Sequence, residues 1–203
     1  MSDPVPPLTA PTRHSAGPRR SEASHAAILD AAEAILAERG SGGLTFEAVA
    51  RRAGAGKPTL YRWWPNRTAL LLEVYDRRKH RELPDHDTGD LAGDLLAVLA
   101  DLWRFWRETP AGRAYAGIIA EAQQDDAARA VIAGQWTAPN FSLTPIFDRA
   151  LARGDLTDAG EALTLREYVA AMNWFRLLTG RLDPADLPGL VATLIAGRTA
   201  RRG

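Results

Sequence analysis

The sequence predicts an all-α fold of about nine to ten helices, divided into a small N-terminal domain and a larger C-terminal domain. Apolar residues recur every three or four positions along most of the chain after residue 20. No stretch alternates apolar and polar residues for long enough to require a strand. With 46% hydrophobic residues among 203, the chain can bury a substantial core.

The first 20 residues contain five prolines and almost no large apolar side chains, so we expect a disordered tail. A first helix should begin at Ser21, because apolar residues return at helical spacing from Ala27 to Leu36. Gly40, Gly42 and Gly43 supply several candidates for the residue that ends it.

Two short helices and a longer one follow. Thr45 can cap a helix that ends near Ala53, and the glycine-rich residues 54–56 allow only a tight turn. Pro58 lies in the first turn of a third helix, which ends at Trp63 or Trp64. Pro65 breaks that helix, and Asn66 can cap a fourth one through residue 81.

Residues 84–89 are polar and rich in turn formers, so we place a domain boundary there, between residues 21–83 and 84–203. Everything beyond this boundary has helical periodicity. The expected helices are Leu91–Thr109, Gly112–Gln123, Asp126–Thr137, Thr144–Arg153, Asp158–Gly180 and Leu187–Arg198.

The charge of the chain is unevenly distributed. The whole chain has 25 basic and 25 acidic side chains, but residues 51–81 hold nine Lys and Arg against two Asp and Glu. A basic N-terminal segment on an acidic remainder suits a phosphate-facing domain attached to one that does not touch nucleic acid. An ordinary solvated charge run is the alternative.

Residues 45–64 have the layout of a helix-turn-helix, with two short helices, a glycine turn, and a bracing helix on each side. In the second short helix, Leu60 and Trp64 should point inward. The side chains left facing outward, which are suited to bases and phosphates, are Lys57, Thr59, Tyr61, Arg62 and Trp63.

This segment resembles the DNA-binding signature of the TetR family over residues 24–75. The matching stretches are Gly43-Leu44-Thr45-Phe46-Glu47-Ala48-Val49-Ala50-Arg51-Arg52-Ala53-Gly54 and Lys57-Pro58-Thr59-Leu60-Tyr61-Arg62-Trp63-Trp64-Pro65-Asn66-Arg67. The resemblance implies that Thr45 contacts a phosphate, that Lys57, Pro58, Thr59 and Arg62 face bases or their flanking phosphates, and that Tyr61, Trp63 and Arg67 hold the DNA backbone. Gly56 stands where relatives often carry a polar side chain, so one contact is missing from the pattern.

The resemblance implies a sequence-specific transcriptional regulator, not an enzyme. It should be a cytoplasmic homodimer, a repressor that a small apolar or aromatic effector releases from a palindromic operator. The alternative is an all-helical enzyme or carrier for small molecules whose basic N-terminal region is incidental. An exposed Lys-Pro-Thr-x-Tyr-Arg helix favours the regulator, because an enzyme has no use for it.

Aromatic residues are numerous in the C-terminal domain, and they are candidates to line an effector pocket. A stripe of aromatics at helical spacing can equally be plain hydrophobic core. The candidate pocket residues are Trp103, Trp106, Tyr115, Trp136, Phe141, Phe147 and Trp174.

The last two helices each carry an apolar stripe, and they have no later helix to cover them. They therefore suit the seam of a dimer, with intramolecular core as the alternative. The candidate interface residues are Leu165, Val169, Met172, Phe175, Leu187, Leu190, Val191, Leu194 and Ile195.

Several other classes of site are not expected. The absence of cysteine excludes disulfides and thiolate metal ligands. His80 and His86 flank a segment that contains Asp85 and Asp87, which we interpret as a polar linker, with a His/Asp metal site as the alternative. No apolar run approaches the roughly 20 residues of a membrane helix, and the N-terminus lacks a signal-peptide pattern. We therefore expect no metal, no cofactor, no catalytic residues and no membrane partner.

Overall fold

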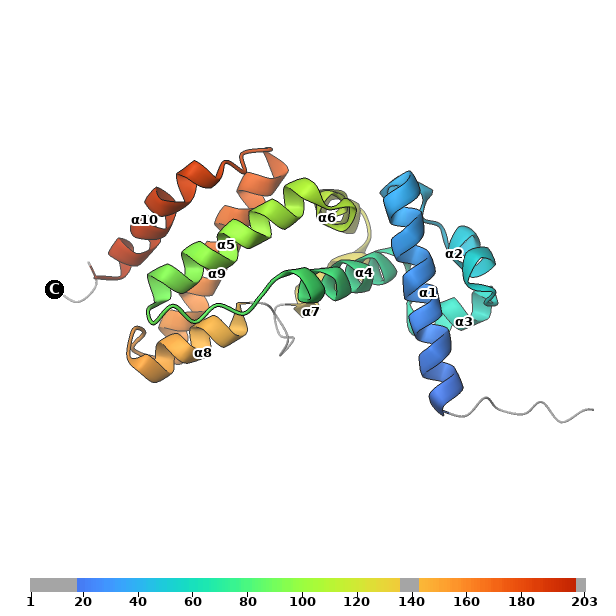
Figure 1. The fold of residues 1–203 in the computed structure, drawn as a ribbon, viewed down its shortest axis with the longest axis horizontal. Helices are drawn as coiled ribbons and strands as arrows, with labels where there is room; N and C mark the ends of the chain where they lie inside the picture. The colour runs from blue at the N-terminus through green and yellow to red at the C-terminus, as the bar shows by residue number, and fades with distance from the viewer. Residues whose placement is uncertain (1–17, 136–142, 200–203) are drawn as a thin grey trace, which may run out of the picture.

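The computed structural model describes residues 18–135 and 143–199. Within these ranges it contains ten α-helices and no strand, which confirms the all-α prediction (Figure 1). The helices are α1 (Pro18–Arg39), α2 (Phe46–Ala53), α3 (Lys57–Trp63), α4 (Arg67–Glu82), α5 (Leu91–Glu108), α6 (Pro110–Ala122), α7 (Asp126–Gln135), α8 (Thr144–Arg153), α9 (Ala159–Leu178) and α10 (Leu187–Thr199).

The first three helices pack together through buried apolar side chains that are continuous with the core of the rest of the molecule. In Figure 1, α2 and α3 lie on the side of α1 that faces away from the rest of the molecule. Leu60 and Trp64 are almost completely buried, which confirms the inward face predicted for the third helix. The other buried contributors to this core are Ile28, Ala32, Ile35, Leu36, Leu44, Phe46 and Val49.

Local capping explains why these short helices begin and end where they do. The Thr45 hydroxyl accepts a hydrogen bond from the Ala48 amide at 3.1 Å, and the Asn66 side chain caps α4 in the same way through Ala69. Gly54 ends α2 with φ +62°, a conformation that L side chains rarely adopt. The predicted caps at Thr45 and Asn66 are thus confirmed.

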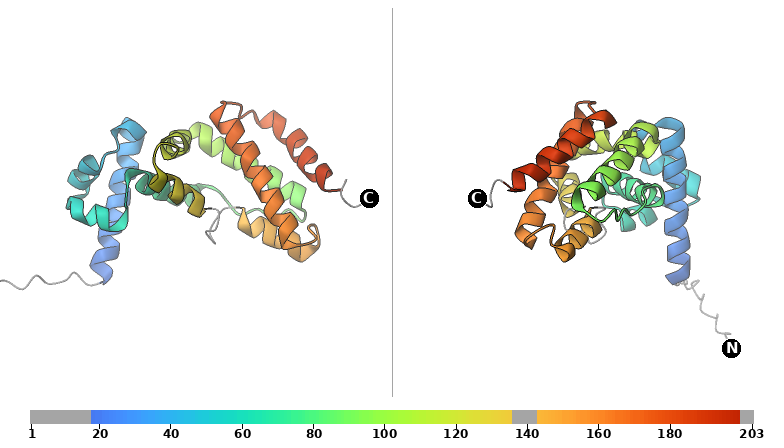
Figure 2. Two further views of the ribbon diagram at one scale, coloured as in Figure 1. Left: turned by 180° about the vertical axis from the view of Figure 1, so that it is seen from behind. Right: turned by 60° about the vertical axis from the view of Figure 1, so that its left-hand side comes forward.

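Helix α4 connects the small domain to the body of the molecule, and it packs on α6 (Figures 1 and 2). Its buried face carries Leu70, Leu71, Val74 and Tyr75. Helix α1 contacts both α4 and α6. The small domain therefore packs against the connecting helix and against one helix of the body.

Charge pairs with α8 hold the connection after α4. Arg149 of α8 binds both carboxylate oxygens of Asp85 at 2.9 Å. Arg153, also on α8, pairs with Asp87 at 2.9 Å and with the fully buried Asp94 at 2.8 Å. The non-helical residues 83–90, which include the predicted boundary at 84–89, are therefore held against α8.

Some helix ends differ from the prediction. Helix α1 begins at Pro18, three residues inside the expected tail, and the rest of that tail lies outside the described residues. Helix α6 begins at Pro110 rather than Gly112, because the Thr109 hydroxyl caps it by accepting from the Gly112 amide at 2.9 Å. Trp136 and Phe141 also lie outside the described residues.

Candidate nucleic-acid interface

Helix α3 presents its outward face to solvent. Tyr61 is 58% exposed and Trp63 is 39% exposed, although both are large aromatic side chains. Lys57, Pro58 and Arg62 are also exposed, and Thr59 is partly exposed. The seven-residue helix therefore offers polar and aromatic groups along one side while Leu60 and Trp64 anchor the other.

The beginning of α3 carries an ion pair that sequence reasoning missed. The Lys57 ammonium contacts the Glu47 carboxylate of α2, and this hydrogen bond lowers the pKa of Glu47. Both side chains are about half exposed, so the pair is open to solvent and to a competing phosphate. It positions the ammonium at the turn between the two helices.

Tyr61 and Arg62 are each supported by a neighbouring ring. Tyr61 places its ring edge-on against Phe46, with centroids 4.8 Å apart, and still leaves more than half of its surface exposed. The Arg62 guanidinium lies 5.8 Å from the centroid of Trp63. These contacts restrain both side chains without burying them. Each side chain is therefore accessible for contact with DNA.

Arg67 does not belong with the other predicted DNA contacts. Its three guanidinium nitrogens donate to the carbonyl oxygens of Leu44 and Ser41 and to the carboxylate of Glu121 on α6. The resemblance implied that Arg67 holds the DNA backbone, whereas in this structure all three guanidinium nitrogens have partners within the chain. The side chain instead ties the start of α4 to the loop before α2 and to the body.

Two residues near α3 escaped the sequence reasoning altogether. The His25 ring of α1 lies between Trp63 and Trp64, with centroids 4.7 and 4.9 Å away. Glu73 of α4 contacts His25 Nε2 at 3.0 Å and accepts a hydrogen bond from Trp64 Nε1 at 2.6 Å. Neither residue belongs to a sequence motif, and their partners are distant in the sequence. Local sequence patterns therefore could not identify them.

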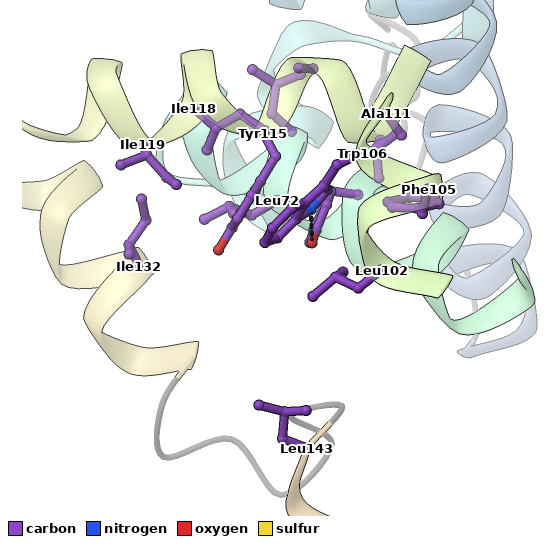
Figure 3. Close-up of a cluster of buried hydrophobic side chains, with 14 of the residues drawn as sticks. Leu72, Leu102, Phe105, Trp106, Ala111, Tyr115, Ile118, Ile119, Ile132 and Leu143 are labelled. Carbon is purple, nitrogen blue, oxygen red and sulfur yellow. Dashed lines mark hydrogen bonds between the residues drawn. The ribbon is translucent and has the colours of Figure 1, made fainter. Parts of the chain in front are cut away.

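The body contains an aromatic cluster that joins three helices (Figure 3). Trp106 of α5 donates from Nε1 to the Tyr75 hydroxyl of α4 at 2.9 Å, and Tyr75 stacks on Tyr115 of α6 at 4.2 Å. Burial raises the pKa of Tyr75 and raises that of Tyr115 to about 12, so both phenols stay neutral near pH 7. The candidate pocket residues Trp106 and Tyr115 are thus brought together.

The remaining pocket candidates are dispersed around this cluster. Trp103 is fully buried and donates to Asn173 of α9, and Phe147 of α8 is also buried. Trp174 is partly buried, and it forms a hydrogen bond with the Tyr115 hydroxyl. In Figure 3, Leu143 is drawn below the rings, apart from the other labelled side chains.

Helix α9 buries part of the predicted interface stripe within the chain. Leu165 and Val169 are buried within the chain itself, so they have almost no surface left for a partner. Phe175 is 56% exposed, and Tyr168 and Leu178, which sequence reasoning passed over, are similarly exposed. The exposed stripe therefore consists of the partly exposed Thr164 and the exposed Tyr168, Ala171, Phe175 and Leu178. It shares Phe175 with the predicted stripe.

Helix α10 divides its apolar residues in the same way. Leu187 and Val191 are buried within the chain, whereas Leu190, Leu194 and Ile195 are only partly covered. A groove of about 600 Å³ runs between α9 and α10, and Tyr168 and Leu194 contribute to its walls. Seen from behind (Figure 2, left), α9 has no other helix in front of it.

The described residues contain neither a metal-binding cluster nor a membrane-spanning helix. Among the described residues, no three His, Asp or Glu side chains are grouped as they would be to bind a metal ion. In the same part of the chain, no helix is both long and apolar enough to cross a membrane.

Two protein families match the sequence. Residues 28–74 match the family of bacterial regulatory proteins named after tetR. Residues 85–194 match the C-terminal domain described as tetracyclin repressor-like.

Curated relatives carry related descriptions. The DNA-binding transcriptional repressor TetR of Mycobacteroides abscessus is 30% identical over 177 residues, which cover 85% of this chain and 92% of the relative. The HTH-type transcriptional regulator AqdR of Rhodococcus erythropolis is 29% identical over 83% of this chain and 81% of its own length. The regulator YdeS of Bacillus subtilis is 36% identical over 89 residues, and the match spans 45% of that relative.

Solved structures show the same arrangement of helices. The TetR family transcription regulator SCO0332 superimposes with a TM-score of 0.73 at 30% identity, covering 86% of this chain and 97% of the other. A TetR regulator from Rhodococcus sp. RHA1 gives 0.64 at 18% identity, covering 87% and 96% of the two chains. The second likeness concerns the fold alone.

Proposed function

The chain belongs to the TetR family of helix-turn-helix transcriptional regulators, and from that premise we propose that it is a dimeric repressor released from its operator by a small apolar effector. We assign DNA binding to residues 21–83, and effector binding and dimerisation to residues 84–203. The observation that carries the DNA-binding assignment is the exposed face of α3, where Thr59, Tyr61 and Arg62 are held for contact but not buried.

In this proposal, the side chains of α3 enter the major groove. Arg62 suits a bidentate contact with guanine, and Thr59 or Pro58 can meet a thymine methyl group. Lys57 and Tyr61 suit phosphates, as does Thr45 near the start of α2, where the helix dipole favours an anion. A DNA-binding regulator of a bacterial chromosome acts in the cytoplasm, so we place the protein there.

The test begins with a duplex that carries the site selected by the wild-type protein from a random DNA pool. Arg62→Ala should weaken binding to this duplex about 10- to 100-fold, because one bidentate base contact is lost. Arg129→Ala on α7 is the matched control, since it also removes one exposed positive charge but lies in the body. Equal affinities for Arg62→Ala and wild type would contradict the assigned recognition face.

We assign dimerisation to the exposed stripe on α9 together with the uncovered side of α10. The stripe Thr164, Tyr168, Ala171, Phe175, Leu178 has the alternating four- and three-residue spacing of a helix-helix seam. Three large apolar side chains, those of Tyr168, Phe175 and Leu178, are exposed along this stripe, and a second copy would cover them. Two α3 helices related by a two-fold axis would then read a palindromic operator.

Effector control is proposed to act through α4. Tyr75 lies on this helix and stacks in the aromatic cluster with Trp106 and Tyr115. A planar apolar effector that separates these rings would displace Tyr75 and therefore α4, which leads into the DNA-binding domain. A shift of a few kcal/mol between two arrangements is enough to release an operator.

The effector proposal is tested by screening aromatic compounds for an increase in melting temperature, followed by titration into the protein–operator complex. A ligand that stabilises the protein should also lower its affinity for the selected duplex. A stabilising ligand that leaves operator affinity unchanged would favour the alternative, a helical carrier whose DNA-binding domain is not coupled to the pocket. No enzymatic step is assigned to the cluster.

A further inference from the structure

We infer that Glu73 is a positioning residue for DNA recognition, because it fixes the end of α3 through Trp64 and His25. The inference rests on the DNA-binding function proposed above and concerns how α3 is oriented. We name the three side chains the His25–Trp64–Glu73 junction. It connects three helices: His25 lies on α1, Trp64 directly follows α3, and Glu73 lies on α4.

Glu73 uses both of its carboxylate oxygens within this junction. Oε2 accepts from Trp64 Nε1 at 2.6 Å, and Oε1 lies 3.0 Å from His25 Nε2. Hydrogen bonds to a charged group are shorter and stronger than neutral ones. The carboxylate is 40% exposed, so the junction can form and break without burying an unpaired charge.

His25 completes the junction from the opposite helix. Its ring stacks on Trp64 at 4.9 Å with an interplanar angle of 19°, and it meets Trp63 edge-on at 4.7 Å. One imidazole therefore touches the last residue of α3 and the residue that follows it. Rotation of α3 about its axis would break at least one of these ring contacts.

Helix α3 depends on such external restraints because its own ends are weakly fixed. It has seven residues, too few to be stable alone, and its N-cap is Gly56, which has no side chain to cap it. Apart from the junction, the buried anchor of α3 is Leu60. The angle at which Arg62 reaches a base therefore depends on how Trp64 is held at the end of α3, in addition to the contacts of Lys57 and Tyr61 with α2.

The junction also extends the path from the body to DNA. Tyr75 in the aromatic cluster and Glu73 in the junction lie two residues apart on α4. A displacement of α4 would therefore move the Glu73 carboxylate, to which the end of α3 is hydrogen-bonded. This links the aromatic cluster to the orientation of the recognition helix itself, beyond any motion of the whole domain.

The experiment compares two DNA duplexes of equal length, one with the site selected by the wild-type protein and one with the same bases scrambled. Glu73→Ala should reduce affinity for the selected duplex about tenfold and leave the scrambled duplex nearly unaffected, because the phosphate-facing cations remain. The salt dependence of binding should keep its slope. Glu73→Gln should recover most of the loss, since its amide oxygen can accept from Trp64.

The matched control is Glu82→Ala, which removes a glutamate from the last turn of the same helix, where it pairs with Arg78. It should bind both duplexes as the wild type does. The indole N–H resonance of Trp64, identified by its absence from Trp64→Phe, should shift in Glu73→Ala and stay in place in the control. If the Trp64 resonance stays in place in Glu73→Ala as well, the inference is overturned.

The inference fails if Glu73→Ala weakens both duplexes equally, or if Glu73→Gln recovers nothing. If Glu73→Ala does not fold, Trp64→Phe decides the matter, because it keeps an aromatic ring in the core and removes the indole N–H that donates to Glu73. If Trp64→Phe then prefers the selected duplex over the scrambled one by the same factor as the wild type does, the inference is overturned. Failure of the wild-type protein to select any sequence would instead refute the proposed function.

Discussion

Side chains of the same type have different roles in this protein because their neighbours differ. Trp63 and Trp64 are adjacent in sequence, yet the first is 39% exposed and the second only 2% exposed. Arg62 and Arg67 both belong to the basic stretch, but Arg62 is exposed whereas Arg67 donates to two backbone carbonyls and to Glu121. Residue type suggests a chemistry, and the surroundings decide whether it is available to DNA.

Asp94 shows the same principle in the body and gives a prediction about pH. Burial alone raises the pKa of this carboxyl group, but hydrogen bonds from Thr88 and Arg153 outweigh it and lower the pKa below its ordinary value. A carboxyl whose pKa is lowered by folding stabilises the fold above its unfolded pKa of about 4, and this contribution is lost as the pH falls through the folded pKa.

Asp94→Asn should therefore lower the free energy of unfolding by about 2–4 kcal/mol near pH 7, because Arg153 loses its buried partner. The difference from wild type should shrink as the pH is lowered below about 4. Urea unfolding at fixed protein concentration over this pH range measures both effects. Asp126→Asn, in an exposed pair with Arg129, serves as the control and should change little. A gap that stays constant with pH would rule out the assigned charge pairing.

At the scale of helices, the distance between two packed helices decides which positions tolerate a larger side chain. Gly112 lies in the first turn of α6, where it meets the end of α5. An added Cβ there would lie 2.1 Å from the Phe105 carbonyl oxygen and 2.6 Å from the Trp106 Cα. These are backbone atoms of a neighbouring helix, which cannot rotate away as the end of a side chain can. The packing of α5 on α6 therefore requires glycine at this position.

Gly112→Ala should destabilise the protein by on the order of 3 kcal/mol, because α5 and α6 must separate to admit the methyl group. Gly117→Ala is the matched control on the same helix, since Gly117 is exposed and an added Cβ there would come no closer than 3.9 Å to the Ser41 hydroxyl. The control should be neutral or stabilising by up to about 1 kcal/mol, because alanine favours helix more than glycine does. Thermal unfolding followed by circular dichroism distinguishes the two, and similar melting temperatures would contradict the close packing.

At the scale of the whole molecule, one helix joins two chemically different domains. The DNA-binding domain is basic and the body is acidic, so a formal net charge of zero hides a strong asymmetry. Helix α4 contributes Arg67 to the domain interface, Glu73 to the end of α3 and Tyr75 to the aromatic cluster. Movement of this helix would therefore be transmitted to both domains.

The proposed dimer gives a prediction at this scale. In a symmetric pair of α9 helices, the central residue of the stripe, Ala171, should lie near its own copy across the two-fold axis. Because the chain contains no cysteine, Ala171→Cys introduces a single thiol. Mild oxidation should then produce a cross-linked dimer on a non-reducing gel. Ala120→Cys, exposed on α6, is the control and should stay uncross-linked. Cross-linking of Ala120→Cys but not of Ala171→Cys would show that the interface lies elsewhere.

The sequence by itself determined the helices and the helix-turn-helix, because both follow from interactions between residues close in the chain. Apolar spacing defines a helix, and caps such as Thr45, Asn66 and Gly54 define its ends within a few residues. These same local signals identified the outward face of α3. The resemblance to a known family added expected roles for individual residues, and these roles stay predictions.

The tertiary structure alone decided the contacts between segments that are far apart in the chain. Arg67 and Glu121 are 54 residues apart, and nothing near either one reveals that they meet. Helix α9 has apolar residues on two faces, so periodicity alone could not show that Val169 is buried while Tyr168 is exposed. A side chain's burial depends on which helices pack against it, and that packing is a property of the whole fold.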